Sequence, residues 1–386
     1  MIYYIFENRL ISEKASSYQV FKVIDAIIES GHKVELIYGN RDEQEISEIK
    51  KKYLLTKYEI SNLPKFTKIK KKDLSSLSYK LLKTTKLQFL LSFIDYFLFL
   101  KKLNKIINKK NNIIYLRNVY LYILLQLILP NKKISKLFLE IHNPINSKIV
   151  NFLLKLSFNK IYPVFICEGL KEKFISKGLI NNNSIVAHDG VDINKVKKEK
   201  DIVETPIKVL YIGNFESNNI SKGIHEFIDF ISQIKSFKHD DYIFKFVGAN
   251  KIQKANLDKK VLEYGLKNIE IHLKIDLYEY DNYFSWANVL LIPNPKIPYF
   301  NYSSPLKLFQ YISQYKPILS TNLDCIKELL PDEIYYFNYN SKDSLIKSLN
   351  DIKQKKINFS NKYDFIIKNY SWLNRQKKIL DPLFIH

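Results

Sequence analysis

The chain has 386 residues, of which 46% are hydrophobic and 26% charged, and its formal net charge is +22. This length exceeds what one hydrophobic core usually supports, so we expect two domains. The sequence has no run of about 18 uncharged apolar residues, which argues against a transmembrane helix. Its only cysteines are Cys167 and Cys325, which argue against a disulfide framework or a zinc site and fit a reducing compartment.

Strand-like apolar runs alternate with helical patterns along the first half of the chain. The opening MIYYIFENRL has no basic region followed by an apolar run, so it predicts a first strand and not a secretory signal. Strands are predicted at 2–6, 33–38, 113–116, 137–141, 164–166 and 184–187. Helices are predicted at 16–29, 119–129, 147–157 and 170–177, and residues 41–112 are less regular.

A second alternating series follows a polar linker at 191–206, VDINKVKKEKDIVETP. Strands are predicted at 208–212, 243–247, 269–272, 289–292, 318–320 and 334–337. Helices are predicted at 223–234, 254–264, 277–286, 305–313 and 342–353. We therefore expect an α/β protein with two Rossmann-like domains, 1–190 and 207–368, each with a mostly parallel sheet. Ligands of such sheets bind beyond the carboxyl ends of the strands.

The positive charge is concentrated in the first domain. Residues 51–150 contain 21 Lys and Arg against four Asp and Glu, which indicates an anionic partner surface. Within this region, residues 87–110 combine Phe, Leu and Tyr with a lysine-rich end. They predict either an interfacial helix on anionic lipid or a buried core helix with a solvated end.

The stretch from Ser303 to Asn322, SSPLKLFQYISQYKPILSTN, predicts a loop, a helix, a turn and a buried strand. Ser304 is a favourable N-cap residue, and Pro305 suits the first helical position, where a missing N–H costs nothing. The free N–H groups and the positive dipole end of this helix would suit a phosphate or diphosphate. A helix start with no ligand is the alternative reading.

This stretch resembles the SPxKxxEYxxxGKPIxxT box of retaining GT-B glycosyltransferases of family 4, the glycosyl transferases group 1. In that family the box holds the diphosphate of a nucleotide sugar. The resemblance implies donor contacts from Ser303, Ser304, Leu306, Lys307 and Gln310. Gln310 and Tyr302 stand where the family has two Glu residues, and Tyr315 replaces a Gly, so a Tyr would be strained there in the left-handed region.

A second donor segment, YIGNFESNNISKG, resembles the family's GRxxxxKG segment, whose basic pair neutralises the diphosphate. Gly213 would allow a tight exit from the strand, and Lys222 would stabilise charge on the leaving phosphate as a catalytic residue. Asn214 replaces the usual Arg, and Lys307 or Lys274 could supply the missing cation. A solvated lysine at a helix start is the alternative for Lys222.

The remaining matches fall in the first domain. His142, in LEIHNP, resembles a histidine of the cleft that contacts the donor sugar or the reacting centre, with a structural histidine as the alternative. Ser16 and Ser17 open the first predicted helix and would offer donors to an acceptor or a phosphate, or simply cap the helix. Glu140 would contact an acceptor hydroxyl, and Arg117 would bind an acceptor phosphate or carboxylate, or pair with Glu140.

The resemblance extends over most of the chain and implies two facing Rossmann-like domains, with a last helix at 369–386 that returns to the first. It implies a hexosyltransferase-type enzyme (EC 2.4) that retains the anomeric configuration and needs neither a metal nor a cofactor. Its substrates would be a UDP- or GDP-sugar and a glycan or lipid-linked acceptor of bacterial lipopolysaccharide or capsule. The basic domain would place the enzyme on the cytoplasmic face of an anionic plasma membrane, and no nucleic acid is expected as a partner.

Other chemistries lack their motifs. The sequence has no GK[ST] phosphate loop, no GxSxG elbow, no DxD triplet and no His/Cys cluster with metal spacing. Three alternatives remain open: a GT-B nucleotide-sugar epimerase, a catalytically degenerate transferase and a non-enzymatic binder of polyanions.

Overall fold

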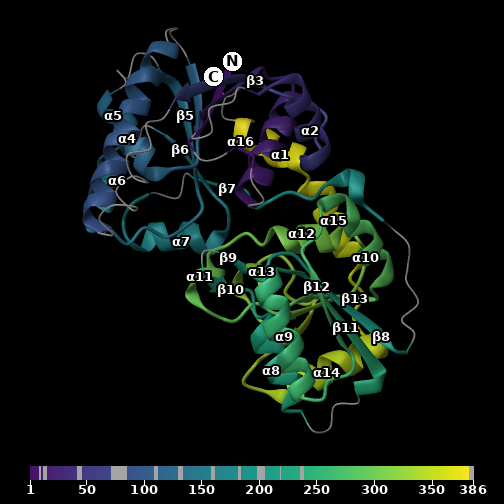
Figure 1. Cartoon of the computed structure of the whole chain (residues 1–386). Coiled ribbons are helices and arrows are strands. Elements are labelled where there is room, and N and C mark those ends of the chain that lie inside the picture. The colour runs from purple at the N-terminus through teal and green to yellow at the C-terminus, as the bar shows by residue number, and fades with distance from the viewer. Residues whose placement is uncertain are drawn as a thin grey trace. The chain divides into compact units, whose positions relative to one another are not determined.

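The computed structural model describes residues 1–7, 10–11, 15–40, 46–70, 85–107, 112–128, 134–157, 161–180, 184–197, 205–217, 219–234 and 239–381. The chain divides into two compact units, Met1–Asp189 with Trp372–His386, and Gly190–Ser371. Each unit is built on a sheet of parallel strands with helices packed around it (Figure 1). The prediction of an α/β protein with mostly parallel sheets is therefore confirmed.

The first unit contains a seven-stranded parallel sheet of order β3-β2-β1-β4-β5-β6-β7. Its strands are β1 (Ile2–Phe6), β2 (Val34–Asn40), β3 (Lys65–Lys70), β4 (Asn112–Leu116), β5 (Ile134–Ile141), β6 (Tyr162–Phe165) and β7 (Ile185–Val186). Its helices are α1 (Ala15–Glu29), α2 (Glu48–Tyr58), α4 (Thr85–Ile106), α5 (Val119–Ile128), α6 (Lys148–Ser157), α7 (Glu168–Ser176) and α16 (Trp372–Leu380). Every residue of the inner strand β1 is buried, as a strand covered on both faces requires.

The predicted strands and helices of this unit occur within a few residues of their expected ends, but residues 41–112 are more regular than expected. They contain α2, β3 and α4. The sequence of α2, EIKKKYLLTKY, shows no clear apolar face of helical period, because only Leu54 and Tyr58 are buried. Ser47 caps its start and Glu59 ends it with φ +50°. β3 is an edge strand rich in lysine, a composition that resembles a loop.

The second unit contains a six-stranded parallel sheet of order β12-β11-β8-β13-β14-β15 and a small antiparallel pair, β9 and β10. Its strands are β8 (Ile207–Ile212), β9 (Glu216–Ser217), β10 (Ile220–Ser221), β11 (Tyr242–Ala249), β12 (Ile269–Leu273), β13 (Val289–Ile292), β14 (Ile318–Thr321) and β15 (Tyr335–Phe337). Its α-helices are α8 (Ile224–Ser232), α9 (Lys251–Glu263), α10 (Tyr280–Trp286), α11 (Pro298–Asn301), α12 (Leu306–Ile312), α13 (Asp324–Lys327), α14 (Lys342–Lys353) and α15 (Ser360–Asn369). Short 3₁₀ turns occur at η3 (Ile193–Lys195), η4 (His239–Asp241) and η5 (Leu277–Glu279).

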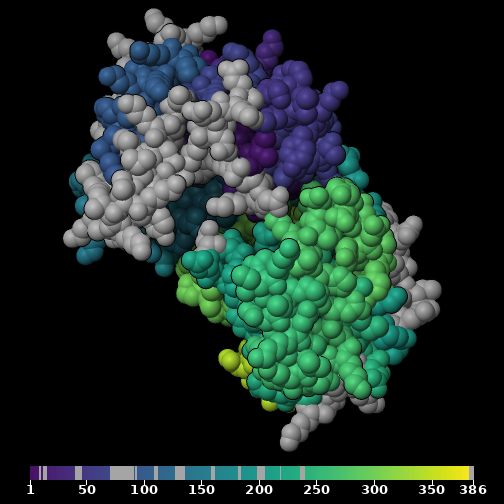
Figure 2. All heavy atoms as spheres, viewed as in Figure 1, coloured from purple at the N-terminus to yellow at the C-terminus, as the bar shows by residue number. Residues whose placement is uncertain are grey.

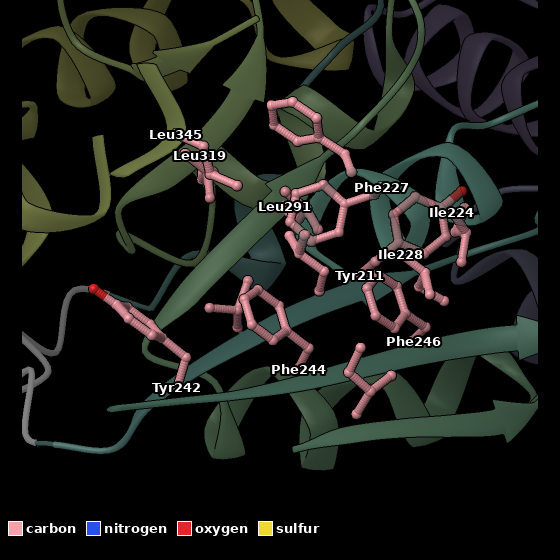
Figure 3. Packing of buried hydrophobic residues seen from close by; sticks show 14 of the residues in the cluster. Tyr211, Ile224, Phe227, Ile228, Tyr242, Phe244, Phe246, Leu291, Leu319 and Leu345 are labelled. Atoms are coloured by element: carbon pink, nitrogen blue, oxygen red, sulfur yellow. The ribbon is translucent and has the colours of Figure 1, made fainter. Parts of the chain in front are cut away.

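Alternate residues of the inner strands of this sheet belong to two separate hydrophobic clusters. On β8, Val209 and Tyr211 join one cluster, whereas Leu210 and Ile212 join the other. The first cluster is strongly aromatic, with Phe227 of α8 packed against Phe244 and other rings (Figure 3). The sheet is therefore buried on both faces, and its strand ends are what remains accessible to a ligand.

Two smaller predictions concern the cysteines and the membrane. Cys167 and Cys325 are free and buried, so neither forms a disulfide. Among the described residues, no helix combines the length and the apolar character needed to cross a bilayer. The predicted linker at 191–206 lies partly outside the described residues.

Candidate functional site

Glycines shape the carboxyl ends of the strands in the second unit. β8 ends at Ile212, and Gly213 follows with φ +132°, while Gly223 precedes α8 with φ +92°. A Cβ atom on Gly213 would lie 2.4 Å from the Lys307 Nζ, and one on Gly223 would lie 1.8 Å from the backbone oxygen of Pro293. Only glycine allows these close approaches in such conformations, so both positions hold the loops around one small region.

Two lysines lie beside these loops, near enough for the charge of Lys222 to act on Lys307. Lys307 lies in the first turn of α12, donates a hydrogen bond to the backbone oxygen of Ile212, and places Nζ 4.2 Å from the centroid of the Tyr211 ring. Lys222, between β10 and α8, places Nζ 4.7 Å from the centroid of the Phe300 ring. Among the described residues, no carboxylate lies within ion-pair distance of either ammonium group. The lysines are therefore held by aromatic faces and a carbonyl, and their charges are not neutralised by an acid.

The environment of these lysines lowers both of their pKa values. Burial lowers the pKa of Lys222 to about 8. Burial, followed by repulsion from Lys222, lowers the pKa of Lys307 to about 7. An anion close to both groups would offset both costs, because it attracts each ammonium and counters their mutual repulsion. Desolvated cations of this kind indicate a functional site, and here the fitting ligand is an anion.

The start of α12 differs from the prediction. Pro305 occupies the N-cap position with φ −77° and ψ 96°, and the helix begins at Leu306. Ser304 is buried and precedes the N-cap position, so the prediction of Ser304 as the N-cap residue and Pro305 as the first helical residue is wrong. The fixed φ of proline suits this extended position equally well, and the backbone oxygen of Pro305 accepts the first helical hydrogen bond from Leu308 at 2.8 Å.

The other predicted donor residues lie around the lysine pair. Gln310 follows Lys307 by one turn on the same helix face, and its half-buried side chain has no hydrogen-bond partner among the described residues. Ser303 donates its hydroxyl proton to the backbone oxygen of Phe300 at 2.8 Å. Asn214 is exposed, and its backbone oxygen accepts a hydrogen bond of 2.7 Å from the Tyr211 hydroxyl. Gln310 is thus the best placed of the three to receive a ligand.

The left-handed conformation expected for Tyr315 is confirmed, with φ +54°. Its hydroxyl bonds to the Asp364 carboxylate, and its ring packs edge-on against Tyr363. These contacts with α15 compensate the strain that a non-glycine residue meets there.

The first unit gathers a separate buried cluster of charges at the carboxyl ends of β4 and β5. Glu140 and Arg375 are each 2% exposed in their side chains and form an ion pair of 2.9 Å. Tyr115 donates its hydroxyl proton to Glu140 Oε2 at 2.5 Å, and His142 Nε2 lies 2.6 Å from Glu140 Oε1. Arg117 Nε is 3.4 Å from the same oxygen. Glu140 therefore lies at the centre of the cluster, with its partners in place.

This geometry bears on the roles expected for Glu140 and Arg117. Glu140 is buried, and both of its carboxylate oxygens have partners inside the cluster. Its contact with an acceptor hydroxyl stays a prediction. Of the alternatives for Arg117, the pairing with Glu140 is the one observed. Arg117 Nη2 also lies 2.8 Å from His142 Nε2 and donates to Gln19 Oε1 at 2.8 Å, so Arg117 joins β4 to α1 and β5.

Charge and burial fix the protonation states of this cluster. Burial alone would raise the pKa of the Glu140 carboxyl, but Arg375, His142 and Arg117 hold it well below its usual range. Burial, followed by the charge of Arg117, lowers the pKa of His142 to about 4, so the imidazole is neutral at neutral pH. Burial raises the pKa of Asp189 to about 6, even though Arg375 opposes the rise.

The two serines expected at the start of the first helix lie inside its first turn. α1 begins at Ala15, Ser17 is fully buried, and the backbone oxygen of Ser16 accepts a hydrogen bond of 3.1 Å from Arg117. Ser16 is half-buried and remains the more accessible of the two.

Three participants were missed at the sequence level: Arg375, Asp189 and Gln19. Gln19 Nε2 donates to both Asp189 carboxylate oxygens at 2.9 Å, and Arg375 Nε donates to the backbone oxygen of His188 at 2.7 Å. The sequence signal that could have pointed to Arg375 is the scarcity of arginine, because Arg117 and Arg375 are two of only four arginines in the chain.

Residues 192–370 match the family model of the glycosyl transferases group 1. The match covers nearly the whole of the second unit, Gly190–Ser371. The chain is accordingly a transferase. Lys222 and Lys307 lie within the matched residues, whereas the Glu140 cluster lies outside them. A comparison with curated proteins by sequence gives no significant match.

Solved structures resemble the whole chain. The lipopolysaccharide outer core galactosyltransferase WaaB in its apo form is 13% identical, with 99% of each chain covered and a TM-score of 0.66. HepE from Anabaena in complex with UDP is 13% identical, with 99% of each chain covered and a TM-score of 0.67. An E. coli trehalose-6-phosphate structure bound with UDP-2-fluoro glucose is 10% identical and covers 100% of this chain and 99% of that one, with a TM-score of 0.70. At these identities the likeness establishes the fold of the glycosyltransferase, which is GT-B.

Proposed function

We propose that this glycosyltransferase moves a sugar from a UDP- or GDP-sugar to a glycan acceptor, with retention of the anomeric configuration and without a metal ion. The observation that carries the proposal is the pair of Lys222 and Lys307, two desolvated ammonium groups that have no carboxylate partner among the residues the structure describes. Structures of the same fold that contain UDP or UDP-2-fluoro glucose support a nucleotide sugar as the ligand.

In this proposal the lysine pair receives the diphosphate of the donor. Lys222 and Lys307 take the role that a divalent cation plays elsewhere, because they supply two positive charges to the diphosphate as it leaves. Gln310, one turn after Lys307, would donate or accept a hydrogen bond at the ribose. Because burial lowers the pKa values of both lysines, donor binding would be coupled to proton uptake: the bound diphosphate would restore the protons that burial has removed.

The transfer step balances without a further reactant. The bond between the anomeric carbon and the diphosphate oxygen breaks, and the acceptor oxygen bonds to the same face of that carbon. The acceptor proton passes to an oxygen of the leaving diphosphate. Charge on that diphosphate rises as the bond breaks, so Lys222 and Lys307 bind the transition state more tightly than the ground state.

We assign the acceptor to the first unit, together with the role of His142 at the sugar or the reacting centre. A neutral imidazole can donate or accept a hydrogen bond to a sugar hydroxyl, and Arg117 and Glu140 fix its ring. The resemblance of the whole chain to WaaB supports an acceptor of the lipopolysaccharide or surface-glycan type, carried on a lipid. That acceptor and the lysine-rich first unit together support a location on the cytoplasmic face of the plasma membrane.

A donor panel tests the proposal. The full chain would be incubated with UDP- and GDP-sugars, with EDTA present, and followed for release of the nucleoside diphosphate and for the anomer formed. We expect at least one donor to be turned over in EDTA, and Lys222→Met to lower kcat more than it raises KM. Absence of both turnover and binding for every donor would overturn the proposal, and epimerisation of the donor sugar would replace it by an epimerase function.

A further inference from the structure

Helix α6 exposes a row of large apolar side chains. Ile149, Phe152, Leu153 and Leu156 are 73%, 63%, 38% and 66% exposed. Their spacing of three, four and seven residues places them on one face of the helix. The buried residues of α6 are Val150 and Leu154, which lie on the adjacent face. α6 is therefore apolar on two faces, and only one of them packs on the first unit.

The neighbouring helices extend this surface. α5 contacts both α4 and α6, so the three helices form one layer, drawn in blue on one flank of the first unit in Figure 1. Atoms in this range of blue reach the surface in Figure 2. On α4, Ile94, Phe97, Lys101 and Lys105 are spaced by three or four residues and share its outer face. Phe97 is 47% exposed, and both lysines are exposed. The interfacial helix predicted within 87–110 thus has a described outer face of the expected kind.

The charge on this surface has one sign. Between residues 85 and 157 the sequence contains only two acidic residues, Asp95 and Glu140, and each is 1% exposed. Lys148 and Lys155 are exposed on α6, beside its apolar row. Apolar side chains and lysines are thus presented together, with no accessible carboxylate between them.

We propose that the outer face of α4, α5 and α6 docks on an anionic phospholipid bilayer, with α6 lying in the plane of the interface. Its apolar row would enter the boundary between headgroups and acyl chains, while Lys148, Lys155, Lys101 and Lys105 contact lipid phosphates. A second copy of the chain fits less well, because a twofold contact would bring this basic face against itself. A bilayer supplies both the apolar phase and the negative charge.

This surface deepens the proposed function, since an acceptor on a lipid carrier would lie at the same interface. It does not depend on sugar transfer, because vesicle binding is measured without a donor. The test is flotation of the full chain with vesicles of equal parts phosphatidylcholine and phosphatidylglycerol, and with vesicles of phosphatidylcholine alone. Donor hydrolysis in the absence of vesicles is measured in parallel, so a failure of docking is distinguished from a failure of the proposed enzyme.

Two double variants and a matched control define the outcome. Phe152→Ser with Leu156→Ser is expected to lower the partition coefficient by at least about tenfold, because two large apolar side chains no longer leave water. Lys148→Glu with Lys155→Glu is expected to lower binding to the anionic vesicles and to leave the weak binding to phosphatidylcholine unchanged. The control is Ile252→Ser with Leu262→Ser on α9, whose side chains are 74% and 81% exposed in the other unit.

The control is expected to bind vesicles like the parent chain, and all variants are expected to keep its melting temperature. The proposal is overturned if the α6 variants bind as tightly as the parent, or if the α9 control loses as much binding as they do. It is also overturned if sedimentation shows a dimer that the α6 variants convert to a monomer, because the face would then be an interface between copies.

Discussion

Replacement of Lys307 by methionine removes one of the two ammonium groups that we assign to the diphosphate. A hydrogen bond that involves a charged group contributes about 1.5–3 kcal/mol, so we expect the Kd for UDP or GDP to rise by about 10- to 100-fold. Methionine keeps the length of the side chain over the Tyr211 ring, which limits the loss of packing. Lys259→Met, at a lysine of α9 whose side chain is 77% exposed, is the matched control and should leave Kd unchanged.

The lowered pKa values of the two lysines also predict how many protons the site takes up when a diphosphate binds. The pKa of Lys307 is about 7 and that of Lys222 about 8, so at pH 8 the free site lacks about 0.9 and 0.5 proton at the two groups. Binding of a diphosphate raises both pKa values and takes up about 1.4 protons. In Lys307→Met only Lys222 remains, and the uptake at pH 8 falls to about 0.5 proton.

The direction of the pH dependence of diphosphate affinity follows from this proton uptake. Because the bound state holds more protons, the affinity falls as pH rises above about 7, and it falls more steeply above about 8, where both lysines must be protonated on binding. The phosphate of UDP has lost its last proton in this range and does not contribute. Calorimetry at pH 8 in two buffers of different ionisation enthalpy gives the number of protons directly. Binding without proton uptake, or equal uptake by the parent and Lys307→Met, would refute the assignment of the pair to the anion.

Three further outcomes are expected. Arg375→Met leaves the buried Glu140 carboxylate without its ion pair and should lower the free energy of unfolding in urea by about 3–5 kcal/mol, with part of the loss recovered when Glu140→Gln is added. Gly223→Ala, whose Cβ would overlap a backbone oxygen, should destabilise the chain far more than Gly265→Ala, which has the same sign of φ but open space; thermal unfolding compares them. The His142 imidazole should titrate near pH 4 by NMR and not near its ordinary value, because burial and Arg117 disfavour its charge.

The fold was predictable where apolar patterns have one period and clear ends. The structure has a strand at Val289–Ile292 and a helix at Lys342–Lys353, both at the predicted bounds. A short buried apolar run indicates a strand, and an apolar spacing of about four residues indicates a helix, so each pattern predicts one element. α2 was not predicted, since packing on α1 buries only two of its residues and its lysines obscure the pattern. Its existence depends on tertiary contact and on caps at Ser47 and Glu59 more than on a local apolar face.

The site was predictable in part. Gly213 and Lys307 come from local motifs, and the structure places them side by side, although 94 positions separate them in the sequence. The Glu140 cluster was predicted only through residues on adjacent strand ends. Arg375 reaches Glu140 from 235 residues away, and no local pattern marks a partner at such a distance. A helix at the end of the chain supplies the counter-charge, so only the folded unit reveals it.

The distribution of arginine and lysine between these two clusters follows from their chemistry. Arg117 and Arg375 lie among Glu140, Asp189 and Tyr115, and a guanidinium keeps its charge when buried, so the first cluster is a permanent network. A lysine in a similar position loses its proton near neutral pH, as Lys222 and Lys307 do. A site that must bind an anion and later release it gains from such groups, because their charge increases when the ligand arrives and decreases when it leaves. The replacement of the family's arginine by Asn214 is therefore consistent with a donor site that works with lysine alone.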